Sequence, residues 1–147
     1  MKAYNTSKRT IHCMVMLVTL MLFNTGCNND DTKTPSSPPE VEIISPSANS
    51  IFKIDWGGAW PEEERMLIKA TGRSEAGLVL VRIRVLDSQG SLVFQRDFFP
   101  QAPDWHEYEF QEQFYTETEG EYELIILLVD TEEQQFESEP IPFRFEL

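Results

Sequence analysis

The feature that most constrains this fold is a strict alternation of apolar and polar residues in short segments over the last two thirds of the chain. The clearest segment, residues 79–85, has the apolar set Val79, Val81, Ile83 and Val85 at every second position. A period of two sends successive side chains to opposite faces of a strand, whereas a helix needs a period of 3.6. No segment shows convincing helical periodicity, so the sequence predicts an all-β domain.

Seven such segments lie between Val41 and Leu147, separated by turn residues such as the Asp87–Gly90 group. They cover residues 41–45, 66–71, 79–85, 92–99, 106–111, 121–128 and 141–147. Residues 51–54 form a further short edge piece. Seven strands in about 107 residues are typical of a seven-stranded Ig-like β-sandwich.

A tyrosine near the start of the sixth segment supports this interpretation. Gly120-Glu121-Tyr122 resembles the tyrosine corner of Ig-like domains, in which the tyrosine hydroxyl closes the turn between strands five and six. The Cys–Trp–Cys pattern of antibody domains is absent, so the resemblance is to the fibronectin-type or bacterial variety. The opening residues 41–46 also resemble the start of Ig-like modules in bacterial lipoproteins of unknown function.

The first 26 residues predict export. Lys2, Lys8 and Arg9 precede about ten apolar residues, 14–23, which is long enough for a secretory signal and too short for a membrane-spanning helix. Residues 24–27, Asn-Thr-Gly-Cys, resemble a bacterial lipobox, although Asn24 stands where that family usually has leucine. The resemblance implies a signal peptide over 1–26, lipidation of Cys27 and anchoring in the membrane. Cleavage with plain secretion is the alternative.

Residues 27–40 connect the anchor to the domain at 41–147. Cys27 is the only cysteine left once Cys13 is removed with the signal, and lipidation explains an exported chain with a lone thiol. Residues 28–40 contain no apolar residue except proline, which predicts a disordered linker. Asp30-Asp31 is similar to export signals of some Gram-negative lipoproteins, so we expect an outer-membrane location, periplasmic or cell-surface.

Charge and site chemistry argue against most enzymes. From Cys27 onward the chain keeps nine basic and all 25 acidic residues, a net charge of −16 that disfavours nucleic acid and anionic surfaces. Its one histidine, His106, has no nucleophile motif beside it and is read as structural. The turn 130–133, Asp-Thr-Glu-Glu, is oxygen-rich but lacks the spacing of a calcium loop, and an ordinary hairpin is the better interpretation. We predict no enzyme activity, metal or cofactor.

Two binding surfaces are predicted. The tryptophans Trp56, Trp60 and Trp105 are candidates for stacking on sugar rings, with plugging of the sandwich ends as the alternative. The other surface follows from antiparallel pairing of the third and sixth strands, which places arginines 82 and 84 opposite glutamates 121 and 123. It also gathers an apolar patch on the outer face, unless a loop or strand covers it: Leu78, Leu80, Ile125, Leu127 and Pro142.

The sequence thus favours a lipid-anchored, non-catalytic Ig-like module that binds an envelope protein through this patch. A carbohydrate-binding module that uses the three tryptophans is the alternative.

Overall fold

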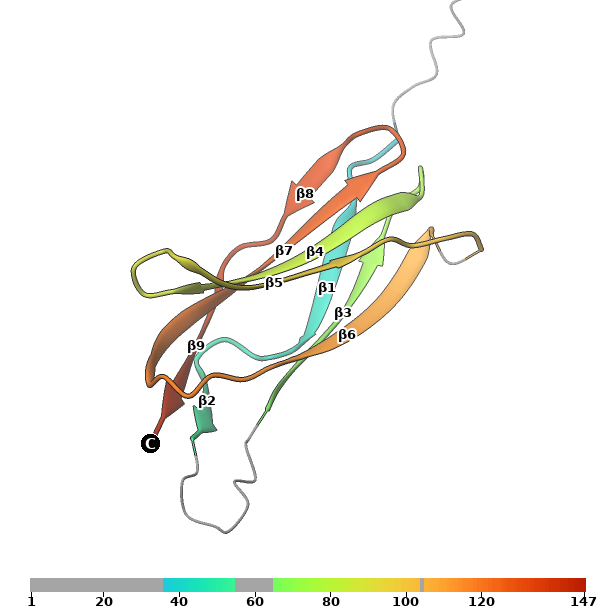
Figure 1. The fold of residues 1–147 in the computed structure, drawn as a ribbon. Coiled ribbons are helices and arrows are strands. Elements are labelled where there is room, and N and C mark those ends of the chain that lie inside the picture. Colours follow the sequence, from blue (N-terminus) through green and yellow to red (C-terminus); the bar gives the residue numbers. More distant parts are fainter. Residues whose placement is uncertain (1–35, 55–64, 104) are drawn as a thin grey trace, which may run out of the picture. The chain divides into compact units, whose positions relative to one another are not determined.

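The computed structural model describes residues 36–54, 65–103 and 105–147, which form strands joined by turns (Figure 1). The strands are β1 (Glu40–Ser45), β2 (Ser50–Lys53), β3 (Met66–Arg73), β4 (Leu78–Asp87), β5 (Leu92–Phe98), β6 (Glu107–Phe114), β7 (Gly120–Asp130), β8 (Gln135–Glu137) and β9 (Ile141–Glu146). No described segment is a helix with the length and apolar character needed to cross a bilayer. The signal sequence, Cys27 and the Trp56–Trp60 loop lie outside the described residues.

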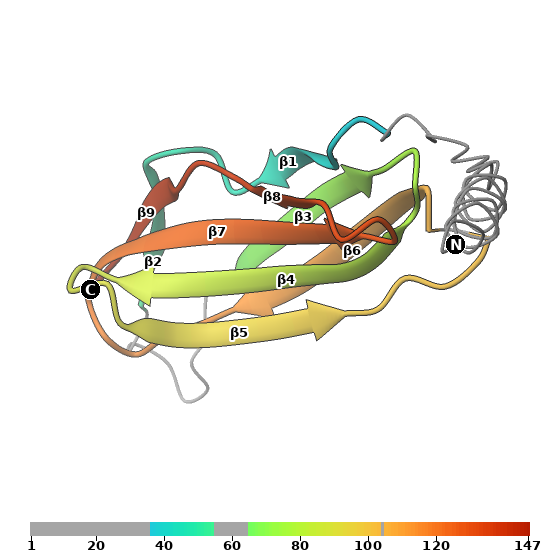
Figure 2. The same cartoon turned by 90° about the horizontal axis from the view of Figure 1, so that it is seen from above.

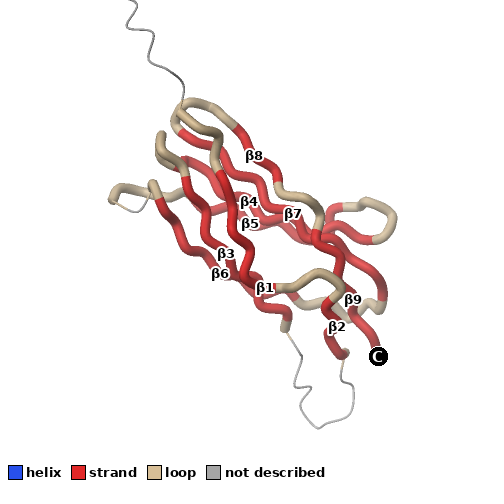
Figure 3. Tube along the Cα trace, turned by 180° about the vertical axis from the view of Figure 1, so that it is seen from behind, coloured by secondary structure: helices blue, strands red, loops and turns tan. Residues whose placement is uncertain are grey.

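The strands form two facing sheets, as Figures 2 and 3 show from above and from behind. The smaller sheet has the order β1-β3-β6, and the larger has the order β2-β9-β7-β4-β5, with β8 also paired to β7. All pairs are antiparallel except β2 with β9. The all-β Ig-like sandwich is therefore confirmed. The seven predicted strands are all present, β2 corresponds to the short edge piece expected at residues 51–54, and only the short strand β8 is additional.

The core lies between the sheets and takes most of its side chains from the predicted inward positions of both. Val81, Ile83 and Val85 of β4 are fully buried, as the alternation predicted. Aromatic rings fill one half of the core and contact one another edge to face or stacked: Phe52, Phe114, Tyr122, Phe143 and Phe145. Such pairs stabilise a core beyond the area that they bury.

The predicted tyrosine corner is present. The Tyr122 hydroxyl donates a hydrogen bond to the Thr118 carbonyl oxygen at 2.8 Å, and the ring stacks on Phe143 with centroids 5.7 Å apart. Gly120 begins the strand, two residues before Tyr122. The hydroxyl thus satisfies a turn carbonyl while the ring belongs to the core.

The folded unit begins earlier than predicted. Residues 36–40, expected to be the end of the linker, belong to the domain, because Pro39 is fully buried and Glu40 starts β1. The Ser36 hydroxyl donates to Glu132 Oε2 at 2.9 Å, and Gln134 Nε2 donates to the Ser36 carbonyl oxygen at 3.0 Å. A polar, proline-rich segment can therefore be fixed by hydrogen bonds to a neighbouring turn, which composition alone does not reveal.

Candidate functional site: the outer face of the larger sheet

The outer face of the larger sheet differs from the predicted patch at the start of β4. The register of β4 on β7 shifts between Leu78 and Leu80, so one residue is inserted there. A bulge of this kind reverses the side-chain alternation on one side of it. Leu78 is consequently fully buried and Val79 is 41% exposed. The prediction that Leu78 faces outward and Val79 faces the core was therefore wrong. Leu78 cannot belong to an outer patch.

Three apolar side chains of the predicted patch remain on this face of β4 and β7, with arginines beside them. We call them the apolar stripe: Leu80, Ile125 and Leu127. Across the β4–β7 pair, Arg84 lies opposite Ile125, which is buried, and Arg82 lies opposite half-buried Leu127. The predicted arginine–glutamate pairs are therefore wrong, because Glu123 lies opposite Leu86 further along the strands. The predicted continuous exposed patch is reduced to a half-covered apolar stripe.

The arginines pair with acids on the two neighbouring strands instead. Arg82 donates two hydrogen bonds to Asp97 of β5, at 2.8 and 2.7 Å, and Arg84 pairs with Glu137 of β8. The hydrogen bonds from Arg82 hold the pKa of Asp97 below its usual value, and the same bonds raise the pKa of Arg82. These fixed ion pairs give the apolar stripe a charged rim.

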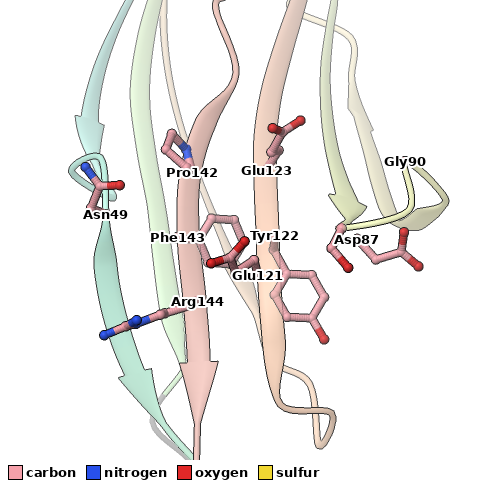
Figure 4. A pocket seen from close by; sticks show the side chains of 10 residues that line it. Asn49, Asp87, Gly90, Glu121, Tyr122, Glu123, Pro142, Phe143 and Arg144 are labelled. Atoms are coloured by element: carbon pink, nitrogen blue, oxygen red, sulfur yellow. The ribbon is translucent and has the colours of Figure 1, made fainter.

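A hollow of about 550 Å³ lies on the same sheet beside the β4–β5 hairpin (Figure 4). We call it the distal hollow. Its charged lining residues are Asp87, Glu121, Glu123 and Arg144, and Pro142 lines the wall between β9 and β7. In Figure 4 the carboxyl groups of Glu121 and Glu123 project from β7, with Arg144 on one side and the hairpin on the other. The hollow thus carries more carboxylates than cations.

The carboxylates of the hollow differ in whether they already form hydrogen bonds or ion pairs within the domain. Asp87 Oδ1 accepts hydrogen bonds from the Gln89 and Ser91 amides at 2.9 and 2.8 Å, which fixes the hairpin. Gly90, with φ of +77°, supplies the left-handed residue that this turn needs. Within the described part of the chain, neither Glu121 nor Glu123 is in an ion pair. Two carboxylates therefore remain available to a ligand on a rigid strand.

Trp105, the one predicted sugar-stacking tryptophan among the described residues, lies at the end of β4 away from the distal hollow. Trp105 is 37% exposed, and its ring lies against Gly77. His106 accompanies it on the exposed rim, with Nδ1 3.2 Å from the Ser74 carbonyl oxygen. Trp56 and Trp60 lie outside the described residues, so the sugar-binding alternative stays a prediction.

The acidic turn 130–133 is organised by its own backbone. Asp130, 1% exposed, accepts hydrogen bonds through Oδ1 from the Glu132 and Gln134 amides, both at 2.9 Å. Glu132 accepts from Ser36, as described above. In residues 36–54, 65–103 and 105–147, no three Asp, Glu, His or Cys side chains are grouped as metal ligands would be.

The distal hollow was not predicted from the sequence. Pro142 was identified, but Asp87 and the two glutamates join it only because β7 pairs with β4 on one side and β9 on the other, and Asn49 joins it because its amide donates a hydrogen bond to the Pro142 carbonyl oxygen. The sequence does place Glu121 and Glu123 on the same face of one strand, next to the strand that contains Pro142. That pattern could have indicated an acidic site here.

Comparisons with known proteins return similar folds at low sequence identity. No protein-family model and no curated protein matches the chain. A fibronectin(III)-like module of Clostridium thermocellum CbhA is 19% identical with a TM-score of 0.47, over 72% of this chain and 94% of that one. CopC from Methylosinus trichosporium OB3b is 20% identical with a TM-score of 0.45, over 73% and 94%. The CARDB domain of PF1109 from Pyrococcus furiosus, solved with di-metal ions, is 11% identical with a TM-score of 0.42, over 76% and 89%. The function must be argued from the site itself.

Proposed function

We propose that this chain is a lipid-anchored outer-membrane protein whose Ig-like domain binds an envelope protein, without catalysis, at the distal hollow and the adjoining apolar stripe. The observation that carries the proposal is a concave site with two carboxylates, Glu121 and Glu123, that form no ion pair with any described residue and project from the same strand. The resemblance of residues 24–27 to a lipobox supports the anchor.

The position of the hollow in the domain suits a tethered binding module. Ser36, where the described chain begins, is bonded to the turn between β7 and β8. The distal hollow lies at the other end of β4, where Asp87 ends the strand. The ten residues of β4 span about 30 Å at the usual rise per residue. A chain anchored through Cys27 would present the hollow away from the anchored end.

The chemistry of the face favours a partner with a basic side chain beside an apolar one. Glu121 and Glu123 would accept hydrogen bonds from a lysine or arginine that enters the hollow. Leu80 and Leu127, half-buried in the stripe, would contact the apolar residue, with the Arg82–Asp97 pair at the rim. An apolar centre with a polar rim is the usual arrangement of protein interfaces.

Photo-cross-linking from the hairpin tests this function directly. A photoreactive amino acid at Ser88, which lines the hollow and is exposed, should form an adduct with one envelope protein in intact membranes. Changing Glu121→Arg together with Glu123→Arg should abolish the adduct, and Leu127→Asp should weaken it. Glu109→Arg, an exposed position on the other sheet, is the matched control and should leave it intact. An adduct that survives the double charge reversal would refute the proposed site.

A further inference from the structure

Three large apolar side chains are exposed around the start of β4, at the end away from the distal hollow. Phe99 is 65% exposed, Val79 is 41% exposed and Trp105 is 37% exposed. They come from different segments, because Val79 belongs to β4, Phe99 follows β5 and Trp105 precedes β6. We call these three residues the apolar tip.

A backbone hydrogen bond and a ring contact bring Trp105 next to the start of β4. The Trp105 carbonyl oxygen accepts a hydrogen bond from the Leu78 amide at 2.6 Å, next to Val79. The Trp105 ring covers Gly77 so closely that a Cβ there would lie 3.3 Å from Cδ2. Phe99 follows directly on the pair between Val81 and Phe98, which brings it beside the first residues of β4. The segments that carry Trp105 and Phe99 therefore both lie beside the first residues of β4.

The tip lies at the end where the chain enters the domain. The Thr131 amide donates to the Gly77 carbonyl oxygen at 2.9 Å, and the next residue, Glu132, accepts from Ser36. Only eight residues separate Ser36 from Cys27. The nine steps between them reach at most about 30 Å in a fully extended chain. A lipid on Cys27 would thus keep this end close to the bilayer surface.

We propose that the apolar tip inserts into the interfacial region of the phospholipid bilayer that holds the anchor, so that the domain stands on the membrane by this end. The inference rests on the proposed lipid anchor. Tryptophan favours this interfacial region, and phenylalanine accompanies it on the membrane-facing side of interfacial helices. The contact is weak by itself and becomes effective because the anchor supplies a high local concentration of lipid.

The charges around the tip specify the lipid. Glu75 and Glu133, in the two turns at this end, are exposed, and the exported chain is strongly acidic. Anionic lipids would repel them, so the contact depends on apolar insertion and is strongest on zwitterionic lipid.

The test uses the fluorescence of Trp105 in the full lipidated chain. With Trp56→Phe and Trp60→Phe, Trp105 is the only tryptophan. After reconstitution into phosphatidylcholine vesicles, its emission should shift to shorter wavelength and be quenched by lipid brominated in the acyl chains. Val79→Asp with Phe99→Asp should remove both effects, whereas the control Leu92→Asp, 52% exposed at the other end of β5, should not. Replacing part of the lipid with phosphatidylglycerol should reduce the quenching.

The outcomes separate this inference from the anchor itself. If the protein floats with the vesicles but bromine does not quench Trp105, the tip does not insert and the anchor stands. That result would leave the tip available to a protein partner instead. If the protein does not float with the vesicles, the anchor and the insertion are both refuted. A quenching that grows with phosphatidylglycerol would contradict the apolar mode of contact.

Discussion

Removing the Tyr122 hydroxyl should destabilise the domain by a small amount that the structure allows us to estimate. In Tyr122→Phe the ring remains 5% exposed in the core and keeps its contacts with Phe114 and Phe143, so only the hydrogen bond to Thr118 is lost. A neutral hydrogen bond contributes about 1 kcal/mol. Thr118 is exposed, so its carbonyl oxygen can bind water instead. We therefore expect a loss of no more than about 1 kcal/mol.

Urea unfolding measures this effect. With a slope of about 1–2 kcal/mol per molar urea, a loss of 1 kcal/mol lowers the midpoint by about 0.5–1 M and leaves the slope unchanged. Tyr122→Ala also removes the ring and should cost about 3–5 kcal/mol, as for other large aromatic truncations in cores. If Tyr122→Phe were as costly as Tyr122→Ala, the hydroxyl and not the ring would carry the contribution of Tyr122 to stability, against this expectation.

Three further changes test other parts of the fold. Asp130→Ala should destabilise by about 2–3 kcal/mol in urea unfolding, because two turn amides lose a charged acceptor, whereas Asp130→Asn, which keeps an acceptor oxygen, should cost less. Gly77→Ala should cost more than Gly90→Ala, since both have positive φ but only Gly77 lies against a ring; equal losses would contradict this packing. The lowered pKa of Asp97 contributes stability above the ordinary aspartate pKa of about 3.9, and that stability disappears as the pH falls below it. Arg82→Gln should therefore be less stable than the parent at pH 7, with a difference in stability that narrows as the pH falls through the lowered pKa of Asp97; a constant difference would refute the linkage.

The fold was predictable because each long strand carries its own alternating pattern and each turn its own residues. The β4–β5 hairpin at Gly90 and the hydroxyl of Tyr122 are examples, since both depend on residues close in the sequence. Leu78 was misplaced because a bulge inserts one residue into a strand without changing its composition. The distal hollow could not be predicted because it depends on the register of three strands. The hydrogen bonds that hold Ser36 could not be predicted because they come from a turn almost 100 residues away in the sequence.

The measurement that tests the central claim most directly is the intact mass of the protein recovered from the membrane fraction, beside a Cys27→Ser variant. A chain that begins at Cys27 and carries three acyl chains, absent from the variant, is the predicted result. It would establish the anchor on which the tethered binding module depends. A soluble chain without lipid would contradict the account, because neither the distal hollow nor the apolar tip would then be held at a membrane.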